Sequence, residues 1–86
     1  MSFEPKYSNQ AKKFLKKSEK EVTNRILIKI EKLCENPVIH DSKTIEGSHN
    51  LFRVRVGDYR ILYEVDHTER IIGIVKIDKR ESVYLH

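Results

Sequence analysis

Residues 52–63 of the chain, FRVRVGDYRILY, carry the strongest secondary-structure signal, because apolar and polar side chains largely alternate on both sides of a Gly-Asp pair. Alternation with a period of two is typical of strands that bury one face. Glycine at the first position of a two-residue loop is typical of the type II′ turn, which joins antiparallel strands. The segment is therefore predicted to be a β-hairpin with Gly57-Asp58 as its loop.

The predicted loop also determines which residues of the hairpin lie opposite each other. Counting outward from this loop places Val54 opposite Ile61 on the core face, and Arg55 opposite Arg60 on the reverse face. Like charges directly opposite each other destabilise a sheet by a few tenths to about 1 kcal/mol. We therefore expect a negative group near these arginines, either a bound anion or a carboxylate of the chain.

Three arginines share the reverse face of the predicted hairpin: Arg53, Arg55 and Arg60. A guanidinium group presents a rigid fork of donors that matches the oxygens of a phosphate. The register therefore predicts a phosphodiester-binding site at these residues. The alternatives are solvation of the arginines or pairing with carboxylates of the chain, for which the candidates are Asp58, Glu64 and Glu81.

Such a site fits cleavage of RNA, in which a 2′-hydroxyl attacks the adjacent phosphorus. The transition state carries more negative charge on its oxygens than the ground state, so cations already in place accelerate the step without a metal. Arginine is a poor base near neutral pH, because the pKa of a guanidinium exceeds about 12. The histidines form no defined acid–base pair and are expected in loops, a turn and the terminus: His40, His49, His67 and His86.

Two helices are predicted before the hairpin. Residues 10–17 carry apolar side chains with helical spacing, and Ser8 or Asn9 is expected to cap them. A second helix is expected over residues 18–35, because its first residue forms a capping-box pattern with Glu21. An Asn-Pro pair directly after this segment ends the helix.

The remaining strands are predicted on either side of these elements. Residues 2–7 are expected to form a short edge strand, and residues 43–45 a short extended piece within a loop. Residues 70–77 are mostly apolar, which predicts a central strand buried on both faces. Residues 82–85 are a candidate for a short last strand.

The predicted fold class is α+β, with two N-terminal helices packed on one face of a small twisted antiparallel sheet in the order β-α-α-β-β-β. A length of 86 residues is typical of one domain, so residues 1–86 are expected to form a single unit.

The chain is basic, with 17 Lys and Arg against 13 Asp and Glu and a formal net charge of +4. A basic excess favours a polyanionic partner without identifying it. Most of the excess lies in the first third of the chain, where lysines either coat a solvated face or bind RNA: Lys12, Lys13, Lys16, Lys17 and Lys20.

A single cysteine, Cys34, excludes an internal disulfide and is expected to be a small buried apolar residue. The Cys and His residues do not have the spacing of a zinc site, so no metal or other cofactor is expected. Apolar segments are too short to span a membrane, and the N-terminus carries no apolar leader. The protein is therefore expected to be cytoplasmic, with no membrane partner.

Several segments of the chain together resemble the RelE/ParE toxin superfamily. They are the Asn-Pro pair at 36–37, IEG at 45–47, the hairpin at 52–63, Lys79-Arg80 and Val83-Tyr84. The resemblance spans essentially the whole chain, and it points to RelE-type toxins of bacterial and archaeal toxin–antitoxin pairs. It implies a ribosome-dependent endoribonuclease that cuts mRNA in the A site and inhibits translation. The implied partners are a cognate RelB-type antitoxin and the ribosome with its mRNA and rRNA.

The resemblance also implies roles for individual residues. Arg53 and Arg55 match the basic residues of the family's second strand. Arg60 matches the arginine that stabilises the transition-state phosphate. Arg80 matches the arginine that acts at the leaving 5′ oxygen, and Tyr84 the tyrosine that stacks on a splayed base.

The chain departs from the family pattern in two places. Some active relatives carry lysine where Arg53 and Arg55 stand, and lysine can act as a base whereas arginine cannot. The family motif usually has glycine and histidine before the C-terminal arginine, but this chain has Asp78 and Lys79, which adds a negative charge near the predicted site. His86 is a candidate replacement for the missing base, as terminal histidines are in related toxins.

Two other functions remain open at this stage. A ParE-like toxin that poisons DNA gyrase needs no catalytic residues, and Arg60 recurs in such toxins for structural reasons. Tyr84, together with the two arginines of the second strand, favours RNA cleavage over this alternative. A catalytically weak relative that mainly binds its antitoxin is the third candidate, because it would tolerate arginine in place of lysine.

Overall fold

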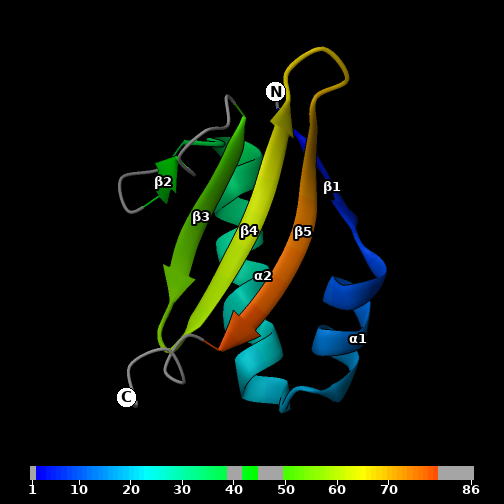
Figure 1. The fold of residues 1–86 in the computed structure, drawn as a ribbon, viewed down its shortest axis with the longest axis vertical. Coiled ribbons are helices and arrows are strands. Elements are labelled where there is room, and N and C mark those ends of the chain that lie inside the picture. Colours follow the sequence, from blue (N-terminus) through cyan, green and yellow to red (C-terminus); the bar gives the residue numbers. More distant parts are fainter. Residues whose placement is uncertain (1, 39–41, 45–49, 80–86) are drawn as a thin grey trace.

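The computed structural model describes residues 2–38, 42–44 and 50–79 of the chain. Its elements, in chain order, are β1 (Glu4–Tyr7), α1 (Asn9–Lys17), α2 (Lys20–Glu35), β2 (Ser42–Thr44), β3 (Leu51–Val56), β4 (Tyr59–Asp66) and β5 (Ile71–Lys79). The strands form one five-stranded sheet in the order β1-β5-β4-β3-β2, and both helices lie on the same side of it (Figure 1). The predicted α+β fold with two N-terminal helices on one sheet face is confirmed.

The β3–β4 hairpin has the predicted register. Val54 pairs with Ile61, and Arg55 pairs with Arg60. Gly57 has a φ of 60°. Asp58, the second loop residue, does not have a positive φ, because Arg70 is the one non-glycine residue with positive φ within the described ranges. Positive φ at the first loop position alone is the type II′ combination, which matches the right-handed twist of the flanking strands.

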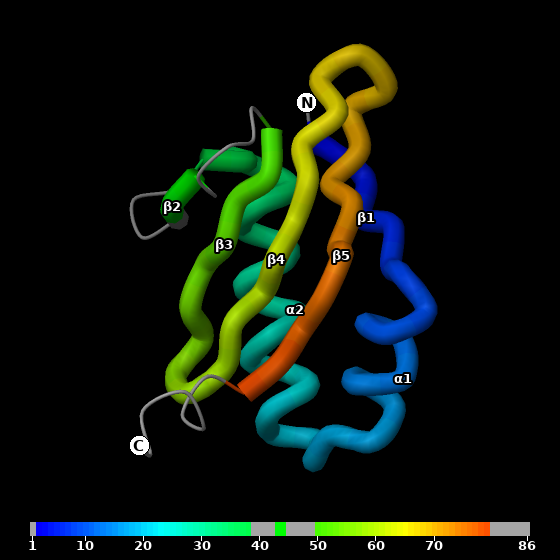
Figure 2. Tube along the Cα trace, viewed as in Figure 1, coloured from blue at the N-terminus to red at the C-terminus, as the bar shows by residue number. Residues whose placement is uncertain are grey.

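The prediction of a wholly antiparallel sheet is wrong for the first strand. β1 pairs in parallel with β5, while β2 to β5 pair antiparallel. The two helices carry the chain across the core face before β2, so β1 is left at the free edge beside β5 (Figure 2). Pro5 lies on this edge strand, where the missing backbone N–H costs no ladder hydrogen bond.

The prediction that the last described strand is buried on both faces is also wrong. β5 is interior to the sheet, but the face away from the helices is open, and Val75 is 38% exposed. The β4–β5 register shifts between Leu62 and Tyr63, which leaves Val75 as an extra residue on β5. Strict alternation after Ile72 and Ile74 would point Ile77 away from the helices. The extra residue shifts the alternation by one, so Ile77 is buried in the core.

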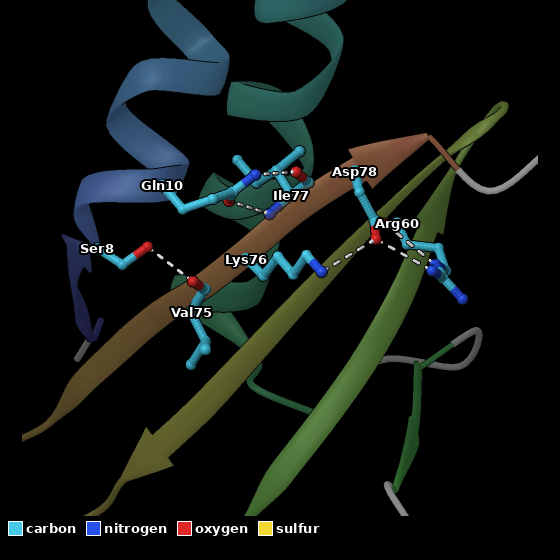
Figure 3. A network of polar contacts seen from close by, with 7 residues as sticks. All are labelled: Ser8, Gln10, Arg60, Val75, Lys76, Ile77 and Asp78. Carbon is cyan, nitrogen blue, oxygen red and sulfur yellow. Dashed lines mark hydrogen bonds and ion pairs between the residues drawn. The ribbon is translucent and has the colours of Figure 1, made fainter.

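Side chains at the start of α1 continue the edge pairing of β5 beyond the end of β1 (Figure 3). Ser8 caps α1 by accepting a hydrogen bond from the Ala11 N–H at 3.1 Å, and it donates to the Val75 carbonyl at 2.7 Å. The Gln10 amide donates to the Ile77 carbonyl at 2.8 Å and accepts from the Ile77 N–H at 2.9 Å. These bonds satisfy backbone groups that would otherwise lack a partner at the sheet edge.

The predicted capping box at the start of the second helix is wrong. The Ser18 hydroxyl donates to the Phe14 carbonyl at 2.7 Å, so Ser18 closes α1. The N-cap of α2 is Glu19 rather than Ser18, and the Glu19 side chain makes no capping bond. α2 ends at Glu35, as its Asn-Pro stop predicted.

The core lies between α2 and the helix-facing side of the sheet. Its largest fully buried side chains are Ile26, Ile30, Leu33, Val54, Ile61, Tyr63, Ile72, Ile74 and Ile77. Cys34 is buried as predicted, and burial raises the pKa of its thiol. The Tyr63 hydroxyl donates to the Pro37 carbonyl at 2.7 Å, which ties the central strand to the end of α2. Neither described helix is long and apolar enough to cross a membrane.

The turn glycine gives a direct test of the hairpin. Gly57→Ala is expected to lower the free energy of unfolding by about 1–2 kcal/mol in urea denaturation, because alanine is strained at a φ of 60°. The new Cβ would also meet the Arg25 guanidinium at 2.5 Å, although that flexible group can move.

Gly73→Ala is the matched control. A Cβ at Gly73 meets Glu64 at an ordinary 3.8 Å, and the position has no positive φ. We expect this variant to change stability by less than about 0.5 kcal/mol. Equal losses in the two variants would contradict the turn assignment.

Candidate functional site

The open face of the sheet carries a group of cations in two cross-strand rows. In the first row Lys43 lies opposite Arg53, and Leu62 separates Arg53 from Lys76. In the second row Arg55 lies opposite Arg60, which lies opposite Asp78. We refer to the five basic side chains of these rows as the basic face: Lys43, Arg53, Arg55, Arg60 and Lys76.

The hairpin and its neighbours create this arrangement through strand alternation. Val54 and Ile61 point into the core, so the residues next to them in sequence point away from the helices. The predicted grouping of Arg53, Arg55 and Arg60 on one face therefore follows the observed register. Sequence reasoning missed Lys43 and Lys76, because their rows depend on the β2–β3 and β4–β5 pairings.

Arg60 forms a bidentate ion pair with Asp78 (Figure 3). The Nε of Arg60 donates to Oδ1 of Asp78 at 3.1 Å, and its Nη2 donates to Oδ2 at 3.0 Å. The Nζ of Lys76 lies 3.9 Å from the same Oδ2. The side chains of Arg60 and Asp78 are 30% and 27% exposed, so water still reaches the pair.

This ion pair corrects the expected source of the counter-charge. Asp78 offsets the repulsion between Arg55 and Arg60 from within the chain, so the repulsion does not by itself require a bound anion. Among the carboxylates considered from sequence, Glu64 lies in a different row opposite Leu51, and Glu81 lies outside the described residues. The sequence predicted that this strand ends at residue 77, whereas β5 continues to Lys79 and so includes Asp78 opposite Arg60.

Arg53 and Arg55 are exposed, and neither makes a hydrogen bond or ion pair with another residue in the described part of the chain. Their guanidinium groups point to solvent from adjacent positions of one strand face. Such groups can bind phosphate oxygens bidentately without first breaking a contact within the protein. The basic face therefore offers an anion two accessible arginines beside a third that is already paired.

Within the described residues, neither side chain whose pKa is raised by burial belongs to the basic face. Burial raises the pKa of the Tyr7 phenol and of the Cys34 thiol, but Tyr7 pairs opposite buried Ile74 and Cys34 belongs to α2. No group of three or more His, Cys, Asp or Glu side chains suited to a metal occurs in the described segments. The described side chains of the basic face supply fixed positive charge, which can stabilise negative charge that develops on a ligand.

Other predicted site residues are either on the opposite side of the sheet or outside the description. The five helical lysines lie on α1 and the first residue of α2, and none of these positions is in the strands that carry the basic face: Lys12, Lys13, Lys16, Lys17 and Lys20. Three of the four histidines and two predicted catalytic residues lie outside the described residues: His40, His49, His86, Arg80 and Tyr84. His67 is exposed in the β4–β5 turn, as predicted.

Comparison with known proteins gives consistent similarities. A sequence model of the family described as ParE toxin of type II toxin–antitoxin system, parDE, matches residues 6–84. A putative toxin RelE1 from Methanocaldococcus jannaschii is 43% identical over 58 residues, and the match spans 64% of each protein, less than two thirds of that relative. A putative RelE-like toxin protein from Escherichia coli is 29% identical over 83 residues, which is 94% of this chain and 86% of that protein.

Solved structures show the same likeness in three dimensions. A chain of an archaeal RelE–RelB complex from Pyrococcus horikoshii superposes with a TM-score of 0.81 and 31% identity, covering 94% of this chain and 98% of that one. A chain of a RelB–RelE antitoxin–toxin complex from Methanococcus jannaschii gives a TM-score of 0.70 and 30% identity, covering 93% and 95%.

The Arg60–Asp78 pair leads to a stability prediction. Arg60→Gln is expected to lower the free energy of unfolding by about 0.5–1 kcal/mol at low salt, the range of a partly exposed ion pair. Arg55→Gln is expected to raise it by a few tenths of a kcal/mol, because it removes only a repulsive neighbour. Urea denaturation at low and high salt measures both effects, which should shrink with salt. A loss for Arg55→Gln as large as that for Arg60→Gln would contradict the assignment.

Proposed function

The chain belongs to the ParE toxin family of type II toxin–antitoxin systems, within the RelE/ParE superfamily, and we propose that it is a RelE-type endoribonuclease that cuts mRNA in the ribosomal A site. The observation that carries this proposal is the basic face, where Arg53 and Arg55 are exposed beside Arg60 on an open sheet. The activity is assigned to one domain spanning residues 1–86.

The proposed reaction needs no cofactor. The 2′-hydroxyl of the mRNA loses its proton and attacks the adjacent phosphorus, a 2′,3′-cyclic phosphate forms, and the 5′ oxygen leaves with a proton. Negative charge grows on the non-bridging oxygens during this step, and Arg60 is the residue we expect to stabilise it. Arg53 and Arg55 would hold the phosphates of the bound strand.

Two further roles come from the family resemblance. Arg80 would act at the leaving 5′ oxygen, and Tyr84 would stack on a splayed base. The helical lysines would add sequence-independent contacts to rRNA phosphates, since each such contact contributes to affinity by releasing counterions.

The proposed partners are the ribosome with its mRNA and rRNA and a cognate RelB-type antitoxin. The antitoxin is supported by similarity to chains from RelE–RelB complexes. An antitoxin segment with acidic side chains would neutralise the toxin by covering the basic face, because it would occupy the same cations as RNA.

The family description names ParE toxins, so poisoning of DNA gyrase is the second candidate function. A gyrase poison acts by binding, and the arginines of the basic face would then contribute charge without chemistry. An inactive relative that only binds its antitoxin would show neither activity.

The activity prediction concerns Arg60. In a reaction with purified translating ribosomes, primer extension should show mRNA cuts by the wild type, and Arg60→Ala should slow cutting by about 10²-fold or more. Naked mRNA without ribosomes should remain uncut.

Lys32→Ala is the matched control, because it also removes one positive charge but lies exposed on α2, away from the basic face. Both variants should remain folded at the assay temperature in thermal denaturation. Undiminished cutting by Arg60→Ala would refute the site. Inhibition of gyrase supercoiling without mRNA cutting would replace the proposed function by the second candidate.

A further inference from the structure

Asp78 lies between two cations of the basic face. Its Oδ2 accepts a hydrogen bond from Nη2 of Arg60 at 3.0 Å and lies 3.9 Å from Nζ of Lys76. Lys76 stands two positions before Asp78 on β5, and Figure 3 shows its ammonium group directed toward the carboxylate. One carboxylate oxygen is therefore shared between a bonded arginine and a lysine just beyond hydrogen-bond distance.

The edge of Arg60 that Asp78 occupies is an edge that a phosphodiester would use. Nε and Nη2 of Arg60 bind two oxygens of one carboxylate, and two non-bridging phosphate oxygens take the same two-donor arrangement. A carboxylate and a phosphate cannot both occupy this edge, because two anions at such short distance repel each other strongly. Binding of RNA at this edge of Arg60 thus requires Asp78 to leave it.

Lys76 can replace Arg60 as the ion-pair partner of Asp78. Its side chain is 52% exposed, and lysine has a long flexible stem, so the ammonium can close the gap of 3.9 Å without strain in the backbone. A small rotation of Asp78 along its own strand then exchanges one charged partner for another.

Resting on the proposed function, we propose that Asp78 is a built-in competitor of RNA for Arg60, and that Lys76 receives Asp78 when a phosphodiester displaces it. In the free protein Asp78 holds the Arg60 fork in place and offsets the charge of Arg55. In the RNA complex Asp78 pairs with Lys76 and Arg60 binds phosphate. Asp78 and Lys76 are positioning residues, because they act on the RNA through Arg60.

The competition makes the basic face selective for chains of phosphates. A single phosphate ion that displaces Asp78 forms contacts with Arg60 alone. An RNA strand that displaces Asp78 also binds Arg53 and Arg55 through its neighbouring phosphates, and these contacts offset the loss of the Asp78 ion pair. The ligand class selected is therefore a single-stranded polyanion over inorganic phosphate.

The first experiment measures binding of a short RNA with 2′-O-methyl groups, which has no free 2′-hydroxyl and stays intact. Asp78→Asn is expected to bind it at least about tenfold more tightly than the wild type. Glu64→Gln is the control, because it removes the same charge from the same sheet face, and among the described residues Glu64 forms no ion pair with the basic face. It should change affinity less than about twofold. Equal effects of the two variants would overturn the proposal.

The second experiment is a double-mutant cycle. Lys76→Met should weaken RNA binding about fivefold or more in the wild type, because Asp78 then has no second partner, and much less in Asp78→Asn. Lys43→Met removes a cation from the same face without contact to Asp78 and should have the same effect in both backgrounds. A Lys76 effect that is also the same in both backgrounds would overturn the role of Lys76.

The ¹⁵N NMR signal of the Arg60 Nε–H group provides a readout that a merely structural role would not move. It should shift when the RNA is added and stay in place with millimolar inorganic phosphate, whereas in Asp78→Asn inorganic phosphate should shift it as well. A signal in the wild type that moves equally with phosphate and with RNA would refute the competition. These measurements need no cleavage, so they separate this proposal from the proposed function: absence of mRNA cutting refutes only the latter.

Discussion

In the β3–β4 hairpin, the turn at Gly57-Asp58 fixes each cross-strand pair from Val56–Tyr59 to Leu51–Glu64. A slip of one residue would turn the buried valines and isoleucines toward water and the arginines toward the helices. The same register therefore places the hydrophobic core on one face of the hairpin and the basic face on the other. Because α2 covers only one of these sides, the arginines remain accessible on the other (Figure 1).

Charge balance on the open face limits which of these arginines can bind an anion directly. Arg55 and Arg60 stand directly opposite each other, and the bidentate bond of Asp78 makes this tolerable in the free protein. The same bond occupies donors that a phosphate requires. In this proposal Asp78 raises the stability of the free toxin and lowers its affinity for RNA, which is a trade-off between stability and function.

Local sequence signals predicted the parts of the fold that depend on neighbouring residues. Alternation around Gly57 predicted the hairpin and the grouping of three arginines, and helical spacing with an Asn-Pro stop predicted α2. The parallel pairing of β1 and the bulge at Val75 depend on contacts between distant segments, which no local pattern records. For the same reason Asp78 was recognised as a nearby charge but not as the partner of Arg60. Ser18 was misassigned because one serine side chain can close one helix or open the next.

In the proposed function, the positive charge of the basic face promotes attack of a 2′-hydroxyl on mRNA. Mass spectrometry of the RNA ends produced on translating ribosomes distinguishes this mechanism from other routes of cleavage. Attack by the 2′-hydroxyl predicts a 2′,3′-cyclic phosphate, or the 3′-phosphate formed from it, on the upstream fragment and a 5′-hydroxyl on the downstream fragment. Fragments with a 3′-hydroxyl and a 5′-phosphate, or mRNA that remains intact, would contradict it.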